Sequence, residues 1–487
     1  MLHWQPSLSC SQVKALDRDF QQTECMPGYQ LMKRAAHHCV ELIQSHFNPR
    51  HCTVLCGGGN NGGDGWQIAA ELQATGWSVN VLSSVDPQTL SGDARLAFDA
   101  ASSAKVCWGR WTNGIQIEAD LLVDALIGIG FKPPLTADLK QLINAVSETG
   151  IPVLAVDCPS GLNVDTGDAQ HALPAVLTAT FLALKPGLLT GDGKAASGNV
   201  VSFNLGCHAR FLSSYHSDVQ LLTEVDALPA RSLNHFKHQA GHVLTFGGAQ
   251  QTAGAAMLTA EAALFSGAGL VTLATDEPGQ MAINARRPEV MVCRHQAVPS
   301  VATASVVAVG PGLAASDKAA LDLCLQLTCP AVLDAGALRV LAANPKYSER
   351  WVLTPHTGEA AALLRESSVA VNADRIGSAK RIQQQFGGVV VLKGPGTIVC
   401  GPDRCIINST GNAALGVAGS GDILTGVIAA LQAQGLSPFD AAAAGVYWHG
   451  RAADLWREKH GERGLSVSEL LVLIRAQING VESGTCG

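Results

Sequence analysis

Basic charge, aromatic side chains and long apolar runs are all scarce in this chain of 487 residues. Its formal net charge is −7, whereas a surface for nucleic acid or anionic membrane needs concentrated Lys and Arg. No uninterrupted apolar run approaches the roughly 18 to 20 residues of a membrane-spanning helix. The start, MLHWQPSLSC, has neither a basic segment nor an apolar one, so we expect no signal peptide. These absences predict a chain that binds neither nucleic acid nor a membrane.

Metal-type cysteine spacing is also missing. The 14 cysteines are scattered singly, with no Cys-x-x-Cys pair and no histidine at ligand spacing. Scattered cysteines in a large chain are usually reduced core residues, so we expect neither a zinc site nor a disulfide framework. The compartment that fits is a reducing one, most simply the cytoplasm. No Gly-x-x-x-x-Gly-Lys-Ser/Thr occurs, which excludes the P-loop class.

What the chain does contain is enough apolar sequence for large cores. Its apolar fraction is 47%, and 487 residues exceed what one core organises, so we expect two domains. Strand-like apolar runs alternate with Ala-rich helical stretches, which predicts an α/β fold with parallel sheets covered on both faces. Expected strands are 52–56, 77–82, 121–127, 153–157, 243–246, 270–274, 306–309, 331–333, 352–354 and 389–392. Expected helices include 66–75, 421–434, 439–456 and 467–478. The pattern lapses near 219–233, where we expect the domain boundary.

The first constellation is CGGGNNGGDG (Cys56–Gly65), between an expected strand and an expected helix. Glycines there let backbone amides approach a ligand, and a helix N-terminus favours an anion. Gly57, Gly59 and Gly62 fit Gly-x-Gly-x-x-Gly, a weak dinucleotide-binding pattern on its own. Polar side chains crowd the loop, as in sites for cations or polyols. A purely structural turn stays open as an alternative.

Two further acids follow or end strands in this half. Asp124 lies in VDALIGIGFKPP, before a glycine-rich loop at Gly128–Pro134, and Asp157 precedes Ser160 in VDCPSG. Ligands of open α/β sheets collect outside the carboxyl ends of the strands, where these loops lie. Either acid could instead only cap a turn.

The second constellation is AGSGDILTG, in which Gly419-Ser420-Gly421-Asp422 opens an apolar helix. Free helix amides at Gly419, Ser420 and Gly421 would form an anion hole, and Asp422 could accept a hydroxyl proton, as in phosphoryl transfer. Alternatively, Asp422 could only stabilise the helix, through the favourable interaction of its charge with the helix dipole. KGPGT (Lys393–Thr397) supplies a cation and amides suited to phosphates.

These motifs resemble those of the bifunctional NAD(P)H-hydrate repair enzymes, and the resemblance covers nearly the whole chain. NNGGDG, VDALIGIG and VDCPSG resemble the epimerase part. GHVLTFGG, SGAGLVT, GPGL, TPHTGE, KGPGT and GSGDILTG follow in the order of the dehydratase part. The resemblance implies two three-layer α/β/α domains. Residues 1–220 would be a Rossmann-like epimerase, and residues 221–487 a ribokinase-like, ADP-dependent dehydratase.

The resemblance also implies roles for individual residues. In the epimerase it implies Asp157 as the proton-handling group and a potassium ion on Asn61, Asp124 and Ser160. Its substrates, hydrated NADH and NADPH (NADHX and NADPHX), would be held by Asn60, Asn61, Gly62, Gly63, Asp64, Gly128, Ile129, Gly130, Phe131, Lys132, Pro133, Pro134 and Asp157.

For the dehydratase, the resemblance implies that Asp422 is catalytic and that ADP with magnesium is the phosphoryl donor. The hydrate would contact Ala255, Gly312, His356 and Asp422, and the nucleotide would contact Lys393, Gly394, Pro395, Gly396, Thr397 and Gly421. A homo-oligomer is implied as well. The chain departs from the family at Gly336, where an acid is usual, and at Ala413–Ala414, where Pro-Gly is common.

Two other interpretations remain at this stage. A ribokinase-like vitamin or sugar kinase with an accessory N-terminal domain would use the same GSGD turn, but it has no place for NNGGDG, VDALIG and VDCPSG. A dinucleotide-sensing protein with degenerate sites would be favoured by loss of Asp157 or Asp422, and both are present.

Overall fold

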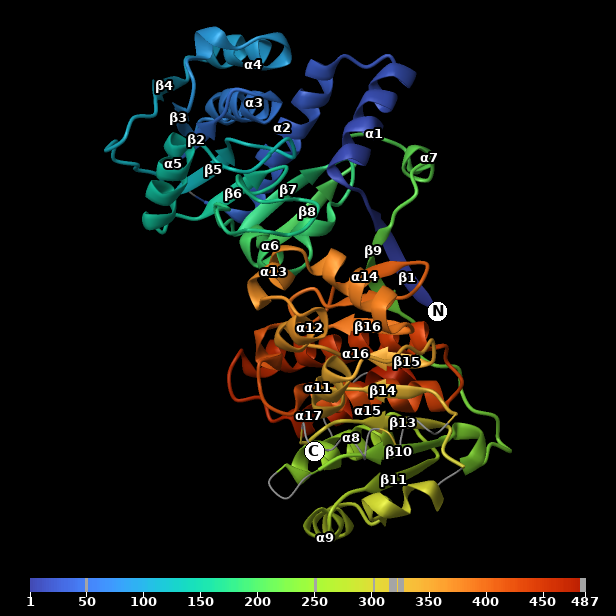
Figure 1. Ribbon diagram of the computed structural model, residues 1–487. Helices are drawn as coiled ribbons and strands as arrows, with labels where there is room; N and C mark the ends of the chain where they lie inside the picture. The colour runs from blue at the N-terminus through green and yellow to red at the C-terminus, as the bar shows by residue number, and fades with distance from the viewer. Residues whose placement is uncertain (49–50, 249–251, 301–302, 315–321, 323–327, 482–487) are drawn as a thin grey trace. The chain divides into compact units, whose positions relative to one another are not determined.

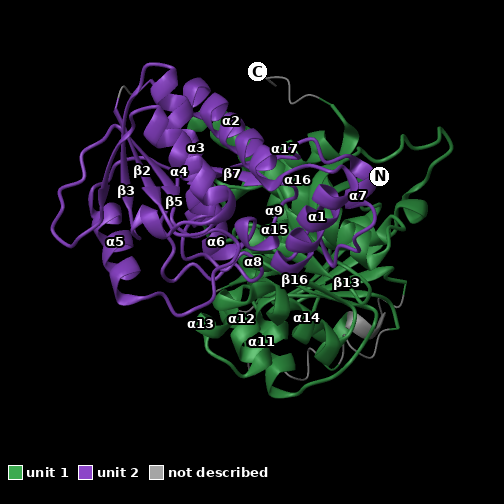
Figure 2. Ribbon diagram, turned by 90° about the horizontal axis from the view of Figure 1, so that it is seen from above, with its two compact units in different colours: residues 1–5, 220–487 green, residues 6–219 purple. Residues whose placement is uncertain are grey.

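The computed structural model describes residues 1–48, 51–248, 252–300, 303–314, 322 and 328–481 (Figure 1). The chain divides into two compact units, residues 6–219 and residues 1–5 with 220–487 (Figure 2). The first five residues thus lie with the C-terminal part of the chain. Each unit is described by itself.

The unit of residues 6–219 is built on a seven-stranded sheet with the order β4-β3-β2-β5-β6-β7-β8, in which all neighbouring strands are parallel. The strands are β2 (His51–Cys56), β3 (Ser78–Ser83), β4 (Cys107–Arg110), β5 (Leu121–Ala125), β6 (Val153–Val156), β7 (Leu177–Phe181) and β8 (Asn199–Phe203). The helices are α1 (Cys10–Thr23), α2 (Gly28–His46), α3 (Asn60–Ala74), α4 (Gly92–Ser103), α5 (Ala137–Glu148), α6 (Gly191–Ser197) and α7 (Ala209–Leu212).

Successive residues of these strands enter opposite cores, because side chains alternate across a sheet. Val54 packs with residues of α1 to α4, whereas its neighbour Leu55 packs with residues of α5. Both faces are therefore covered, which explains why the strands are apolar at every position.

The second unit contains an eleven-stranded sheet with the order β1-β9-β18-β17-β16-β15-β14-β13-β10-β11-β12. Neighbours from β12 to β16 are parallel, and β16, β17 and β18 are antiparallel. The strands are β1 (Leu2–Ser7), β9 (Val219–Val225), β10 (His242–Phe246), β11 (Leu270–Ala274), β12 (Met291–Cys293), β13 (Val306–Val309), β14 (Ala331–Leu333), β15 (Trp351–Leu353), β16 (Val389–Leu392), β17 (Ile398–Cys400) and β18 (Cys405–Asn408).

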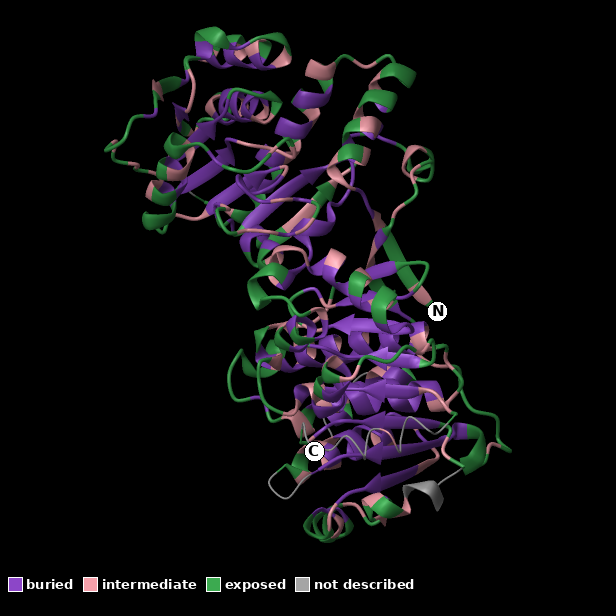
Figure 3. Ribbon diagram, in the orientation of Figure 1, coloured by how far each residue is buried: buried purple, intermediate pink, exposed green. Residues whose placement is uncertain are grey.

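Helices cover both faces of this sheet too. One core joins it to α8, α15, α16 and α17, whereas α14 packs on β16 and β17, with α12 beside it and α11 beside α12. The helices are α8 (Ala253–Phe265), α9 (Glu277–Arg286), α11 (Ala335–Ala343), α12 (Thr357–Leu364), α13 (Ser368–Ala373), α14 (Arg375–Phe386), α15 (Ser420–Ala433), α16 (Pro438–His460) and α17 (Val467–Asn479). The strands of both sheets are mostly buried (Figure 3). The predicted class, α/β with two three-layer units, is confirmed.

One expectation about the cysteines is wrong. Cys400 and Cys405 face each other across the antiparallel pair β17 and β18 and form a disulfide. The other ten cysteines within the described residues are free thiols. Across the same part of the chain, no helix combines the length and apolar character that a membrane span requires.

Candidate active sites

The asparagine and glycine segment of the first constellation is helical. We expected a loop before a helix at Trp66, but α3 begins at Asn60, directly after the extended Gly59. Glycine is required nearby by close packing: a Cβ on Gly57 would meet the carbonyl oxygen of Leu126, and one on Gly62 would meet that of Gly57. The first turn of a helix leaves backbone amides without intrahelical acceptors, so the start of α3 can receive an anion.

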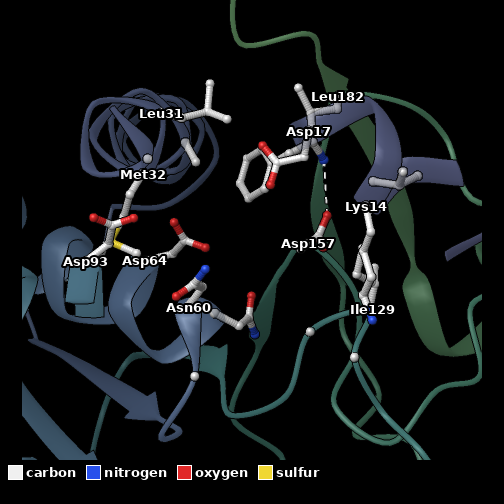
Figure 4. A pocket seen from close by; sticks show the side chains of 18 of the residues that line it. Lys14, Asp17, Leu31, Met32, Asn60, Asp64, Asp93, Ile129, Asp157 and Leu182 are labelled. Carbon is white, nitrogen blue, oxygen red and sulfur yellow. Dashed lines mark hydrogen bonds between the residues drawn. The ribbon is translucent and has the colours of Figure 1, made fainter. Parts of the chain in front are cut away.

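A cavity of about 500 Å³ lies at the start of α3 (Figure 4). Among the predicted residues, the cavity is lined by Asn60, Asn61, Asp64, Gly128, Ile129, Gly130 and Asp157. The other predicted positions, Gly62, Gly63, Phe131, Lys132, Pro133 and Pro134, are not among its lining residues. The cavity therefore gathers the loops after β2, β5 and β6, as parallel strands with a common carboxyl edge should.

Four carboxylates face this cavity from four elements: Asp17, Asp64, Asp93 and Asp157 (Figure 4). Burial raises the pKa of Asp64 well above its usual value, and repulsion by Asp157 and Asp17 adds to the rise. Burial also raises the pKa of Asp17. Asp17 and Asp93 were not predicted, because each is one of two acids on its amphipathic helix and only the fold brings it to the site.

Asp157 has an unusual backbone and a buried cationic partner. Its φ of +67° is in the left-handed region, which a residue with a Cβ adopts only under constraint. Its Oδ1 accepts hydrogen bonds from Lys185 Nζ at 2.5 Å and from the backbone N–H of Phe181 at 3.2 Å. Lys185 was also missed, although a lysine inside the apolar run FLALKPG is a signal for a buried charge.

Two of the predicted cation ligands, Asp124 and Ser160, are in direct contact, and neither is among the residues that line the cavity. Asp124 is fully buried, and its two oxygens accept hydrogen bonds from the Oγ of Ser160 at 2.5 Å and the N–H of Ser160 at 2.7 Å. Burial raises the pKa of Asp124 to about 6, against the lowering effect of these hydrogen bonds. Ser160 Oγ also accepts from the N–H of Ile127 at 2.9 Å, and the next residue, Gly128, packs against the side chain of Asn61.

Asn61 differs from Asp124 and Ser160 in its hydrogen bonding. Both polar atoms of its side chain are buried without a hydrogen-bond partner in the described structure. A buried, unpaired amide oxygen is costly unless a ligand satisfies it. Asn61, Asp124 and Ser160 present the oxygen donors that a hard cation takes, so these residues fit a potassium ion. Within the described residues there is no cluster of three or more His, Cys, Asp and Glu side chains that could hold a metal.

In the second unit, α15 begins at Ser420, after Gly419 in the left-handed conformation at φ +92°. Its first turn presents the backbone amides that we expected to form an anion hole, although the N–H of Ser420 already donates to Val417 O at 3.4 Å. Ser420 Oγ lies 3.3 Å from Nε2 of His449, a buried residue of α16. Burial lowers the pKa of His449 to about 4, so its ring is neutral near pH 7.

Asp422 shares this corner with a lysine and two other acids. Burial, with repulsion by Asp334, raises the pKa of Asp422 to about 6, and Lys393 opposes the rise. Lys393 Nζ donates to Asp334 Oδ1 at 2.8 Å and lies 4.0 Å from Glu359 Oε2. Burial disfavours the charge of Lys393, but Asp334 and Glu359 hold its pKa above the usual value. The fold therefore brings Lys393 to the start of α15, where a Cβ on Gly421 would be 3.1 Å from its Nζ.

The remaining hydrate-contact predictions lie around the same edge. His356 caps α12: its Nδ1 accepts from the N–H of Gly358 at 2.9 Å, while Glu359 accepts from the N–H of His356 at 2.9 Å. Its side chain is 56% exposed, so it stays open to a ligand. Ala255 lies in the first turn of α8. The carbonyl of Gly312 accepts from Thr252 Oγ1 at 2.7 Å.

The predicted nucleotide loop, Lys393–Thr397, is fixed by a buried arginine. Arg375, 2% exposed, donates through Nη2 to the carbonyl oxygens of Leu392 at 3.2 Å and Lys393 at 3.0 Å. Thr397 Oγ1 donates to Gly394 O at 2.9 Å. Arg375, Asp334 and Glu359 were not predicted as site residues. Position could have indicated two of them, because Asp334 and the TPHTGE loop, which ends at Glu359, directly follow expected strands.

The departures from the family have local explanations. A Cβ on Gly336 would meet the carbonyl oxygen of Leu313, so this backbone leaves no room for the usual acid. Ala413–Ala414 begins a short 3-10 helix, Ala413–Leu415, and the side chain of Asn412 caps it by accepting from the N–H of Ala414 at 3.0 Å.

Both units thus place a helix N-terminus beside carboxylates at the carboxyl edge of a parallel sheet. This is the arrangement of α/β enzymes that act on phosphorylated small molecules. Residues 28–187 match the family described as YjeF-related protein N-terminus, and residues 243–475 match NAD(P)H-hydrate dehydratase.

Comparison with known proteins covers nearly the whole chain. It is 38% identical over 464 residues to the bifunctional NAD(P)H-hydrate repair enzyme Nnr of Coxiella burnetii, spanning 93% of this chain and 95% of that one. It is 38% identical over 473 residues to the enzyme of that name from Escherichia coli K12, spanning 93% and 90%. A solved ribokinase-like superfamily protein from Enterococcus faecalis is 26% identical, with a TM-score of 0.50, covering 55% of this chain and 97% of that one.

The chain belongs to the family of bifunctional NAD(P)H-hydrate repair enzymes. The resemblance drawn from the motifs is confirmed, and these relatives fit it better than a vitamin or sugar kinase with an accessory domain.

Proposed function

We propose that this protein repairs hydrated NADH and NADPH, epimerising NAD(P)HX in residues 6–219 and dehydrating the S epimer to NAD(P)H in the second unit. The observation that carries the proposal is that each unit has, among the carboxylates at the carboxyl edge of its sheet, a candidate proton acceptor beside a helix N-terminus. These acceptors are Asp157 near α3 and Asp422 in α15.

For the epimerase, the anionic part of the dinucleotide is assigned to the start of α3 and the loop at Gly128–Gly130, because helix amides bind anions. Asp157 is then left to take the proton of the C6 hydroxyl as the C6–N1 bond opens to an aldehyde, and to return it when N1 attacks the other face of the carbonyl. Asn61, Asp124 and Ser160 would hold a potassium ion, which would supply positive charge next to the substrate. The predicted contacts at Gly62, Gly63 and Phe131–Pro134 stay part of this proposal.

For the dehydratase, the C6 hydroxyl must first become a better leaving group. Asp422 takes its proton as the oxygen attacks the β-phosphorus of ADP, and AMP leaves. The amides at the start of α15 stabilise the charge on the transferred phosphoryl group. Phosphate then departs from C6 as C5 loses a proton, which forms the C5=C6 bond of NAD(P)H. Ala255, Gly312 and His356 are assigned to the hydrate.

The nucleotide is assigned to Lys393–Thr397 and Gly421, where Lys393 lies close to the glycine of the α15 turn. Magnesium bound with the nucleotide would neutralise phosphate charge. The side-chain oxygens of Asp334 and Glu359 beside Lys393 are hard donors that suit such an ion. ADP as the donor and a homo-oligomeric state belong to the proposal. Cytoplasmic location does as well.

The test is recovery of absorbance near 340 nm from a mixed-epimer NADHX sample with ADP and magnesium. The wild-type protein should convert the whole mixture and release AMP and phosphate, after subtraction of spontaneous epimerisation in an enzyme-free control. Asp157→Asn should convert only the S fraction at the enzymatic rate, and Asp422→Asn should convert none. Absence of conversion of the S epimer with either ADP or ATP would refute the dehydratase assignment. Light scattering during gel filtration gives the oligomeric state.

A further inference from the structure

Lys185 is the fully buried cation of the first unit's site. Its side chain has 0% exposure, which is rare for lysine unless the charge is paired. The ammonium group has three protons, and it donates to three acceptors: Asp157 Oδ1 at 2.5 Å, Thr180 Oγ1 at 2.7 Å and Phe181 O at 2.9 Å. Its position is therefore fixed by the end of β7.

The carboxylate of Asp157 is bound on one side only. The hydrogen bonds that the described residues make to it, from Lys185, from the N–H of Phe181 and a long one from Thr180 Oγ1, all reach Oδ1. The backbone N–H of Asp157 donates to Ala179 O at 2.7 Å, which ties the left-handed residue to β7. Oδ2 is left for the cavity that Asp157 lines, and the side chain keeps 14% exposure.

Acidic groups surround this carboxylate, and a second lysine, Lys14 of α1, lines the same cavity. Asp64 of α3 and Asp17 of α1 repel it electrostatically, and the buried thiols of Cys39 on α2 and Cys158 beside it bring no positive charge. Lys185 is the group with opposite charge that contacts it. Without that ammonium, this partly buried carboxylate would have no positive charge in contact with it.

We propose that Lys185 is a positioning residue for epimerisation, which pairs with Asp157 and holds its Oδ1 so that Oδ2 meets the C6 hydroxyl. The inference rests on the proposed epimerase function of this site. Lys185 takes no part in proton transfer itself, because its three protons are committed to hydrogen bonds. Its effect on the reaction therefore depends entirely on Asp157.

The experiment measures kcat and KM of Lys185→Met for epimerisation, with excess dehydratase as the reporter. We expect kcat to fall at least about 100-fold, the size of a lost proton-transfer group, while KM changes little. The control Lys140→Met, on α5 and away from the cavity lining, should match the wild type. Dehydration of the pure S epimer by the same chain shows that the second unit is intact.

A double-mutant cycle separates this role from a structural one. In the Asp157→Asn background, Lys185→Met should cost no further activity, because both act through one carboxylate. This double variant removes both charges and so also serves if Lys185→Met alone fails to fold. If the activity losses of the two single variants multiply in the double variant, or if Lys185→Met keeps full activity, the proposal is overturned. If the wild type does not epimerise at all, the proposed function fails instead.

Discussion

Lys393 and Asp334 form an ion pair at 2.8 Å that joins the loop after β16 to the end of β14. Asp334 is 2% exposed, and its other oxygen accepts a hydrogen bond from Thr425 Oγ1 of α15 at 2.9 Å. One carboxylate thereby aligns the predicted nucleotide loop with the helix that carries Asp422. Two segments that the sequence offered as separate motifs are parts of one site.

Asp334→Asn should weaken this alignment. We expect KM for ADP to rise about tenfold, the effect of losing one charge-assisted hydrogen bond of about 1.5 kcal/mol or more. The acidic limb of the dehydratase profile should also move to lower pH, because Asp334 raises the pKa of Asp422 and Lys393 lowers it. Steady-state kinetics with the S epimer measures both effects, and the epimerase rate is the internal control. A shift to higher pH would contradict this account.

The wild-type dehydratase should lose activity on acidification with a midpoint near pH 6. Asp422 accepts a proton only as a carboxylate, and its pKa is raised to about 6, so protonation below that value removes the base. The measurement is kcat for the S epimer at saturating ADP between pH 5 and 8. A midpoint near the ordinary aspartate value would show that Asp422 is not in the buried environment described above.

Gly62→Ala should damage the epimerase alone. Its Cβ would meet the carbonyl oxygen of Gly57, so the turn into α3 must shift. We expect destabilisation of about 1–3 kcal/mol and a loss of epimerase activity of at least about tenfold. Thermal unfolding and the two rates measure these effects. Gly109→Ala, in β4 with open space around the added Cβ, is the matched control, and an equal loss there would refute the packing argument.

Arg375→Met should loosen the nucleotide loop. It leaves the carbonyl oxygens of Leu392 and Lys393 without their buried donor, which costs about 1–3 kcal/mol per unsatisfied group. We expect a lower melting temperature and a higher KM for ADP, with the epimerase rate unchanged. Arg375→Lys should recover the activity only in part, because an ammonium lacks the planar fork of the guanidinium. Full activity of Arg375→Met would show that the loop holds its shape by other contacts.

The sequence was informative where one residue pattern had one physical explanation. Apolar runs such as Cys52–Cys56 became buried parallel strands, and the GSGD turn opened α15 as expected. The loop predicted for Asn60–Gly65 was wrong, because the segment is helical. Asn and Gly are poor helix formers, but close packing of the first turn of α3 overrides that preference.

Contacts between residues distant in the chain could not be predicted from the sequence. Asp17 and Asp93 reach the cavity only through helix packing, and nothing local distinguishes them from surface acids. Lys185 could have been suspected from its apolar neighbours, but its pairing with Asp157 depends on the adjacency of β6 and β7. The Cys400–Cys405 disulfide was missed because the short turn between two antiparallel strands, which sets the cysteines opposite each other, was not recognised.

The strand β1 has a consequence for how the protein is made. It belongs to the same sheet as β9, and the two strands are separated by the whole unit of residues 6–219. During synthesis β1 leaves the ribosome long before its neighbour in the sheet exists, so that edge stays unpaired while more than 200 residues are translated. A dehydratase fragment cut at residue 220 would lack β1 and expose the edge of β9, which invites association with other chains. A self-sufficient fragment would need residues 1–5 joined to residue 220.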